Sequence, residues 1–268
     1  MVVFPNAKIN LGLDIIAKRP DGYHNIESCF YPIPLTDALE VIESNKLSFT
    51  SSGISIPGNT EDNLCLKAYT LLKERYDLPP VAIHLHKHIP IGAGLGGGSA
   101  DGAFMLKLLN EKFSLHIDNQ ELEKLVGKLG SDCPFFIENK PVFVEGTGNV
   151  FSPIEVSLKG MYLVLVMPDV HVSTAEAYAG VVPQKPEIDL KSALEQKPVD
   201  QWRGLVKNDF EQSVFAQYRE LEDIKNQLIK EGALYASMTG SGAGVYGVFE
   251  AQPELKLNQT NVVFEIKN

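Results

Sequence analysis

The chain has 268 residues, a formal net charge of −10, and 44% hydrophobic and 22% charged residues. This length is enough for one large domain or two modest domains, and the composition is that of an ordinary soluble globular protein. Nucleic acids and anionic membranes attract basic proteins, so the acidic charge argues against either one as a non-specific partner. We therefore expect no nucleic-acid partner and no membrane partner.

The cysteines and the N-terminal segment bear on cellular location. Cys29, Cys65 and Cys133 form no CxxC pair and are odd in number, which fits a reducing compartment. The segment from Met1 to Lys8 lacks the basic stretch and apolar stretch of a secretory signal. The longest strongly apolar run, at residues 162–167, is too short to span a bilayer. We expect a cytoplasmic protein.

The first predicted elements are a strand and a tight turn. Residues 2–17 predict a strand whose apolar content is interrupted by polar residues such as Lys8. Taken alone, Lys8 is best interpreted as a solvated strand residue. Pro20-Asp21-Gly22 predicts a turn. The turn is followed by Tyr23 and His24, which could stack on a nucleotide base or simply lie on the surface.

The next elements lie between residues 35 and 89. Residues 35–57 predict two strands, and a helix is predicted from Glu61 until shortly before Pro79. Asn63, near the start of this helix, is a candidate helix cap. Residues 81–89 alternate apolar with more polar side chains, which predicts a half-buried strand.

Three histidines of that strand, His84, His86 and His88, share one face. Three histidines could bind a metal ion, but no carboxylate or cysteine completes a ligand set nearby. A solvated strand face is the better interpretation.

A glycine-rich loop follows this strand. Five glycines fall between positions 92 and 98, and Ser99 is the predicted N-cap of the helix that comes next. Glycine tolerates positive φ and lets backbone amides approach a ligand closely. Exposed N–H groups and the positive end of a helix dipole then suit a phosphate group.

Three alternatives fit this loop less well. The spacing Gly92-x-Gly94-x-x-Gly97 satisfies a dinucleotide fingerprint, but residues 118–129 predict a helix where that fold needs a second strand. A P-loop ends in Gly-Lys-Ser/Thr, and this loop has Gly98-Ser99 without a lysine. A bare surface loop leaves the backbone entropy lost by five ordered glycines unexplained.

The second half of the chain predicts short elements around a second glycine loop, Met238 to Gly244. Strands are predicted at residues 143–150, 162–167, 234–236, 245–249 and 262–266. Helices are predicted around residues 202–205 and 220–231, and a Pro- and Lys-rich mobile loop at residues 183–198. Pro153 and the sparse segment after it indicate a domain boundary.

Three motifs together resemble those of the GHMP kinases (galactokinase, homoserine kinase, mevalonate kinase, phosphomevalonate kinase). The stretch Pro90-x-Gly-x-Gly-Leu-Gly-Gly-Gly-Ser-Ala resembles the ATP-binding motif of this family, Pro5 to Leu11 its first motif, and Met238 to Gly244 its third. The resemblance covers most of the chain. It implies a two-lobed α+β fold with an N-terminal ATP-binding domain (residues 1–155), a C-terminal domain (residues 156–268), and the active site in the cleft between them.

The resemblance implies an ATP-dependent kinase that uses Mg²⁺. Residues 130–136 resemble the family's Gly-x-Asp-x-Pro-Phe-Phe, whose aspartate is catalytic, so Asp132 is the implied general base and Lys8 its cationic neighbour. Ser99 is a candidate contact for the phosphates or the magnesium ion, and no other protein ligand of the metal is expected. The implied ATP-binding residues are Asn63, Pro90, Ile91, Gly92, Ala93, Gly94, Leu95, Gly96, Gly97, Gly98, Ser99 and Ala100. For Asn63, a simple helix cap remains an equally good interpretation.

The turn region points to the acceptor. Arg19 to His24 resembles the branch of the family that acts on a cytidine diphosphate derivative of methylerythritol, in which the Tyr-His pair belongs to the cytidine pocket. This resemblance implies phosphorylation of the 2-hydroxyl of that small-molecule substrate. The implied substrate-binding residues are Asn10, Tyr23, His24, Thr174, Tyr178, Gly240, Ser241 and Gly242.

Alternatives stay open at this point. A GHMP kinase of the homoserine or mevalonate type binds no cytidine, and Tyr23 with His24 speaks against it. A non-catalytic nucleotide sensor on the same fold is another alternative, and the presence of both Lys8 and Asp132 speaks against it. Tyr178 can also be an ordinary packing residue, and the second glycine loop an ordinary tight hairpin.

Overall fold

The computed structural model describes residues 1–255 and 261–267. The chain divides into two compact units built from interleaved segments. Unit 1 comprises Met1–Lys8, Pro32–Ile91 and Gly96–Lys140, and unit 2 comprises Ile9–Tyr31, Gly92–Leu95 and Pro141–Asn268. The division into two continuous domains, residues 1–155 and 156–268, stays a prediction. Within the described residues, none of the helices has both the length and the apolar content of a transmembrane span.

Unit 1 contains a four-stranded sheet in the order β1-β4-β6-β5. Neighbouring strands pair antiparallel, except that β5 runs parallel to β6. The strands are β1 (Val2–Val3), β4 (Ala38–Glu43), β5 (Ser48–Gly53) and β6 (Val81–Lys87). The two strands expected between residues 35 and 57, and the strand expected from residue 81, are therefore confirmed.

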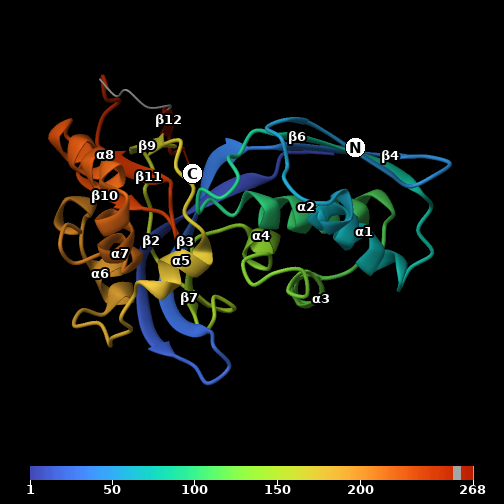
Figure 1. Ribbon diagram of the computed structural model, residues 1–268. Coiled ribbons are helices and arrows are strands. Elements are labelled where there is room, and N and C mark those ends of the chain that lie inside the picture. The colour runs from blue at the N-terminus through green and yellow to red at the C-terminus, as the bar shows by residue number, and fades with distance from the viewer. Residues whose placement is uncertain (256–260, 268) are drawn as a thin grey trace. The chain divides into compact units, whose positions relative to one another are not determined.

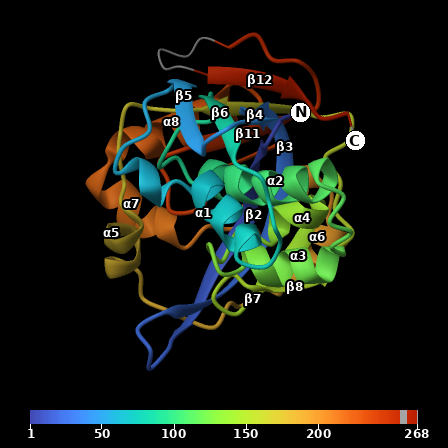
Figure 2. The same cartoon turned by 90° about the vertical axis from the view of Figure 1, so that its right-hand side faces the viewer.

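Helices cover one face of this sheet. They are α1 (Leu64–Lys73), α2 (Gly97–Lys112), α3 (Asn119–Val126) and α4 (Phe135–Glu138), with a 3-10 turn at Thr60–Asp62 before α1. In Figure 1, α1 and α2 lie side by side below β4 and β6, and Figure 2 shows α3 and α4 beside α2. The alternation along β6 buries Ile83 and Leu85 in the core, at 1% and 0% exposure. His84 and His86 lie on the other face and hydrogen-bond Ser52 Oγ, which supports the interpretation of a solvated face.

Unit 2 contains an antiparallel sheet in the order β10-β11-β9-β12. The strands are β9 (Tyr162–Val166), β10 (Tyr235–Met238), β11 (Val245–Phe249) and β12 (Asn261–Glu265). The helical segments are α5 (Thr174–Ala179), α6 (Leu190–Gln196), a 3-10 turn at Val199–Gln201, α7 (Phe210–Gln217) and α8 (Arg219–Lys230). Figure 1 shows α8 beside β10 and β11. Its apolar stripe, including Ile224 and Leu228, packs with Val164 and Val166 of β9 in one core.

A third sheet has the order β2-β3-β7-β8. Its strands are β2 (Asn6–Lys18), β3 (His24–Thr36), β7 (Val142–Glu145) and β8 (Val150–Pro153). The predicted turn between β2 and β3 is confirmed by the hydrogen bond from the Arg19 N–H to the Tyr23 carbonyl, at 2.8 Å. The sequence did not reveal β3, because its Pro32 and Pro34 are poor strand residues. They are tolerated because β3 pairs with β7 only upstream of them, at residues 28–30.

Two predictions in the second half of the chain were wrong. The expected mobile loop at residues 183–198 contains helix α6, which begins where the Asp189 side chain accepts the Ser192 N–H. Residues 202–205 form a turn rather than a helix, because Gly204 adopts a φ of 80°, which a right-handed helix does not allow. The helix of this region is α7, which begins at Phe210.

Candidate active site

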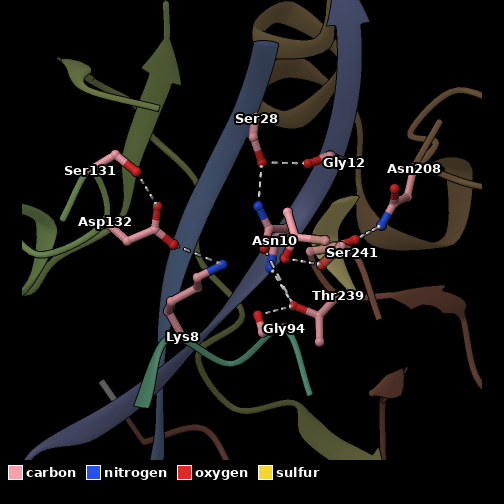
Figure 3. A network of polar contacts seen from close by, with 12 residues as sticks. Lys8, Asn10, Gly12, Ser28, Gly94, Ser131, Asp132, Asn208, Thr239 and Ser241 are labelled. Atoms are coloured by element: carbon pink, nitrogen blue, oxygen red, sulfur yellow. Dashed lines mark hydrogen bonds and ion pairs between the residues drawn. The ribbon is translucent and has the colours of Figure 1, made fainter. Parts of the chain in front are cut away.

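A lysine–aspartate pair lies in unit 1. Lys8 on β2 is 3% exposed, because it lies between the fully buried Ala7 and Ile9. Its Nζ is 3.7 Å from Asp132 Oδ2, and Figure 3 shows the two side chains pointing toward each other. Burial lowers the pKa of Lys8, and the carboxylate of Asp132 opposes this effect only in part. The Asp132 side chain is 32% exposed, so it is accessible to an incoming group.

The segment around Asp132 contacts the first turn of α2 through Cys133 and Ser99. Ser131 Oγ lies 3.4 Å from Asp132 Oδ1, just ahead of α4. Burial raises the pKa of the Cys133 thiol to about 11, and a hydrogen bond with Ser99 opposes this in part. Cys133 is therefore a protonated packing residue, and Ser99 lies beside the chain segment that carries Asp132.

The glycine loop has a repeating backbone conformation. Gly92, Gly94 and Gly96 adopt φ values of 75°, 73° and 70°, a region that residues with side chains rarely enter. The prediction that Ser99 caps the next helix was wrong: Gly96 is the N-cap and α2 begins at Gly97. The cap residue is a glycine because its backbone adopts the left-handed conformation, which serine rarely adopts. A Cβ on Gly96 would lie 3.2 Å from Lys8 Cε, so the loop packs directly against the lysine.

The other predicted ATP-binding residues differ in exposure. Ile91 is 43% exposed, whereas Leu95 and Ala100 are 1% and 0% exposed. Among the rest, Gly92 and Gly98 are exposed, Pro90, Gly94, Gly96 and Ser99 are half-buried, and Ala93 and Gly97 are buried. Asn63 Oδ1 accepts the Cys65 N–H at 2.9 Å as the N-cap of α1. The cap is therefore confirmed, while contact with a base stays a prediction.

Unit 2 holds Asn10 in a buried hydrogen-bond network (Figure 3). Asn10 Nδ2 donates to Ser28 Oγ at 2.9 Å, and this hydroxyl donates to the Gly12 carbonyl at 2.6 Å. The backbone N–H of Asn10 donates to Thr239 Oγ1 at 3.1 Å, and its carbonyl accepts from the Tyr246 hydroxyl at 2.7 Å. Both the backbone and the side chain of Asn10 are therefore fixed.

The second glycine loop packs against the first within unit 2. Thr239 Oγ1 donates to the Gly94 carbonyl at 3.3 Å, and a Cβ on Gly94 would lie 2.0 Å from the Thr239 carbonyl oxygen. Gly240 and Gly242 have φ values of 55° and 93°. Asn208 Nδ2 donates to the Gly240 carbonyl at 2.9 Å. The loop is thus more than a tight hairpin, because side chains from outside it fix its shape.

Two pairs of predicted substrate-binding residues come together within unit 2. Thr174 Oγ1 lies 3.3 Å from Ser241 Oγ. The rings of His24 and Tyr178 are stacked, with centroids 4.8 Å apart and an interplanar angle of 22°. Burial lowers the pKa of His24, which favours its neutral form. Tyr23, by contrast, is 67% exposed.

The sequence did not single out Ser28, Asn208, Thr239 or Tyr246. For Thr239, the available signal was its place in the second glycine loop, directly before Gly240. The other three lie outside every motif, and only the folded chain brings them to Asn10 or to the loop.

The site has few oxygen ligands for a metal ion. Among the described residues, no group of three or more His, Cys, Asp and Glu side chains is placed to hold a metal. Mg²⁺ commonly takes one or two protein oxygens and obtains the rest of its ligands from phosphates and water. The Ser99 hydroxyl fits that limited role, which suits a metal ion that arrives with a nucleotide.

Comparison with known proteins shows relatives along nearly the whole chain. The GHMP kinases N terminal domain matches residues 63–140, and the GHMP kinases C terminal domain matches residues 190–259. The 4-diphosphocytidyl-2-C-methyl-D-erythritol kinase of Bacteroides fragilis is 56% identical over 263 residues, which is 97% of this chain and 95% of the relative. The enzyme of the same name from Bacteroides thetaiotaomicron is 54% identical over 265 residues, with 97% and 96% covered.

Solved structures show the same relationship. A crystal structure of 4-(cytidine 5'-diphospho)-2C-methyl-D-erythritol kinase matches with a TM-score of 0.79 and 30% identity, covering 92% of this chain and 90% of the other. The mevalonate kinase of Methanococcus jannaschii matches with a TM-score of 0.68 and 17% identity, covering 93% and 90%. The second likeness concerns the fold alone. Together these matches confirm the predicted α+β fold.

Proposed function

The chain belongs to the GHMP kinases, and we propose that it is an ATP-dependent kinase acting on 4-diphosphocytidyl-2-C-methyl-D-erythritol. The observation that carries this proposal is 56% identity, along 97% of the chain, to a relative of that name. The reaction transfers the terminal phosphoryl group of ATP to the 2-hydroxyl of the acceptor. The products are ADP and the 2-phosphate, an intermediate on the non-mevalonate route to isoprenoid precursors.

The glycine loop is the proposed phosphate-binding element. A kinase needs a polyphosphate site, positive charge for the transferred group and a residue that orients or deprotonates the attacking hydroxyl. Glycines occupy the three positions with positive φ, Gly92, Gly94 and Gly96, so no side chain of these residues covers the loop backbone. The loop leads into the N-terminus of α2. N–H groups at a helix N-terminus favour phosphate. Bound Mg²⁺ would neutralise phosphate charge, and Ser99 is the residue we propose to contact it.

Asp132 is the proposed general base, and Lys8 its cationic partner. Asp132 accepts the proton of the 2-hydroxyl as that oxygen attacks phosphorus. The Lys8 ammonium, 3.7 Å from Asp132 Oδ2, offsets negative charge on the transferred group. Because Asp132 is partly exposed and Lys8 is buried, the carboxylate can meet the substrate while the lysine stays fixed.

The acceptor is proposed to be recognised through residues of unit 2. The stacked His24 and Tyr178 rings offer an aromatic surface for cytosine, and neutral His24 has both a donor and an acceptor for the polar edge of the base. The hydroxyls of Thr174 and Ser241 are candidate donors for oxygens of the acceptor. Tyr23, Asn10, Gly240 and Gly242 complete the proposed set.

The proposed location is the cytoplasm. Cys29, Cys65 and Cys133 are all free and buried, which suits a reducing compartment. A kinase that consumes ATP also needs a compartment that supplies it.

A coupled ADP-release assay with a panel of acceptors tests the proposed function. The panel contains the cytidyl substrate, free methylerythritol phosphate, mevalonate and homoserine, each with saturating MgATP. We expect turnover with the cytidyl substrate and only background release with the other three. Preferred turnover of mevalonate or homoserine would reassign the acceptor, and background release with all four would overturn the kinase assignment.

A further inference from the structure

A second buried lysine lies at the end of β6. Lys87 Nζ donates to Asp101 Oδ2 at 2.8 Å and also to Asp37 Oδ2. Lys87, Asp37 and Asp101 are 3%, 1% and 3% exposed. Taking three ionisable groups out of water is costly, and apolar residues of similar volume commonly fill such a space without loss of stability. Stability alone is therefore a weak explanation of the cluster, and its position in the fold suggests a different role.

The cluster touches both ends of the glycine loop. At the entry, Asp37 Oδ1 accepts the backbone N–H groups of residues 88 and 89 at 2.6 and 2.8 Å. At the exit, Asp101 lies early in α2, which begins at Gly97. A Cβ on Gly97 would lie 2.9 Å from Lys87 Nζ, so the ammonium packs against the first residue of the helix. One cation thus joins the strand before the loop to the helix after it.

We propose that Lys87, Asp37 and Asp101 are positioning residues that hold the glycine loop in its nucleotide-binding conformation. The proposal rests on the proposed function, in which this loop binds the phosphates of ATP. A glycine-rich loop loses much conformational entropy when it becomes ordered. A loop already ordered in the free protein binds its ligand more tightly, because that entropy is not lost on binding. The cluster acts through the backbone at the two ends of the loop.

The two carboxylates have different surroundings. Asp37 accepts hydrogen bonds on both of its oxygens, whereas Asp101 Oδ1 has no hydrogen-bond partner in the described part of the chain. Asp37 is therefore bound from two sides, by the ammonium and by the backbone of residues 88 and 89, whereas Asp101 is bound through one oxygen. Burial raises the pKa of the neighbouring Cys65, which keeps that thiol neutral.

Nucleotide binding by Lys87→Met tests the proposal. The dissociation constant of a non-hydrolysable ATP analogue is measured by calorimetry on the full chain, beside KM for ATP, kcat and the melting temperature. We expect Lys87→Met to raise the dissociation constant and KM at least about tenfold, the scale on which ordering costs affect binding. At saturating ATP, kcat should stay within about threefold of the parent, since the cluster does not act on the reacting atoms. Lys124→Met, on a side chain that is 74% exposed, is the matched control and should change neither quantity.

Two near-isosteric variants compare the two carboxyl groups and serve if Lys87→Met does not fold. Asp37→Asn changes the group that binds both the ammonium and the backbone before the loop, and it should weaken analogue binding at least about fivefold. Asp101→Asn changes a group that binds the ammonium through one oxygen, and it should weaken analogue binding less. Equal or greater weakening by Asp101→Asn would overturn the leading role of Asp37 at the loop entry. Folded Lys87→Met or Asp37→Asn protein that melts at lower temperature but keeps the parent's dissociation constant would overturn the positioning role.

Failure of the proposed function is visible separately. A parent protein that binds the analogue but does not phosphorylate the cytidyl acceptor would break the acceptor assignment, and the ranking of the variants would still decide the positioning role. A parent that binds no nucleotide would overturn both.

Discussion

Lys8 and Lys87 are both 3% exposed lysines of unit 1, but they have different carboxylate partners. Lys8 has Asp132 at 3.7 Å, on a side chain that is 32% exposed, and burial lowers its pKa. Lys87 has two buried carboxylates at hydrogen-bonding distance. They outweigh the effect of burial and raise its pKa.

This difference separates two uses of a buried cation. Charge attraction grows as the distance and the local dielectric constant fall, so the close, buried Asp37 and Asp101 side chains hold Lys87 charged and fixed. Asp132 is farther from Lys8 and partly in contact with solvent, so it stays available to another group. The first arrangement suits positioning and the second suits chemistry.

Gly96→Val is expected to have the largest effect, because it acts on the Lys8 side of the comparison. A valine is strained at a φ of 70°, and its Cβ would lie 3.1 Å from Phe136 Cζ and 3.2 Å from Lys8 Cε. We expect folded protein without measurable nucleotide binding by calorimetry. Gly58→Val is the control, because Gly58 has a φ of 89° but faces open space. Unchanged nucleotide affinity in folded Gly96→Val protein would refute the phosphate-binding role of the loop.

Asp132→Asn is expected to have the next largest effect. It removes the base beside Lys8, so kcat should fall by roughly two to four orders of magnitude, the scale of acid–base catalysis. ATP affinity and melting temperature should stay close to the parent, because Asp132 is partly exposed. Asp77→Asn makes the same change at an exposed position of unit 1. Turnover within a few-fold of the parent would show that Asp132 only positions the acceptor, and the contrast with Lys87 would lose its chemical meaning.

His24→Ala adds a third site to the comparison, because His24 belongs to unit 2 and both lysines belong to unit 1. Loss of about one hydrogen bond to the base should raise KM for the cytidyl substrate at least about tenfold. KM for ATP should hardly change. Steady-state kinetics with each substrate varied in turn measure both constants, and His86→Ala, on the exposed face of β6, is the control. If the variant weakens ATP binding and leaves KM for the acceptor unchanged, Tyr23 and His24 do not belong to the cytidine pocket.

The smallest expected effect on activity belongs to Asp101→Asn, which tests instead the pH dependence of stability on the Lys87 side. Burial raises the pKa of Asp101 from its ordinary value of 3.8 to about 8, so the folded protein holds a proton that the unfolded chain releases. Stability contributed by this group is therefore greatest below about pH 4 and falls as pH rises toward about 8. Asp101→Asn removes this decline. Denaturant titrations of parent and variant between about pH 5 and pH 8 should converge toward acid. Parallel curves would show that Asp101 is ionised throughout.

The sequence by itself determined the local elements and the family. Glycines at alternate positions of the first loop, a turn at residues 20–22 and alternation along residues 81–89 are short-range signals, because backbone conformation and side-chain period act over a few residues. The predicted fold came from the resemblance to the GHMP motifs, because members of a family share a fold. Lys8 and Asp132 were named from the same motifs.

The tertiary structure decided which of these residues meet and in what electrostatic state. Three contacts bring together residues that are far apart in the chain. They are the Lys8–Asp132 pair, the stacking of His24 on Tyr178, and the hydrogen bond from Asn208 to the second glycine loop. The start of α2 at Gly97 rather than at Ser99 followed from the backbone conformation of Gly96. Burial is a property of the folded chain, and pKa values depend on burial and on neighbouring charge. The strand pattern alone presents Lys8 and Lys87 as equivalent polar residues, and the family motifs single out Lys8. Only the packing shows that Lys87 joins the strand before the loop to the helix after it.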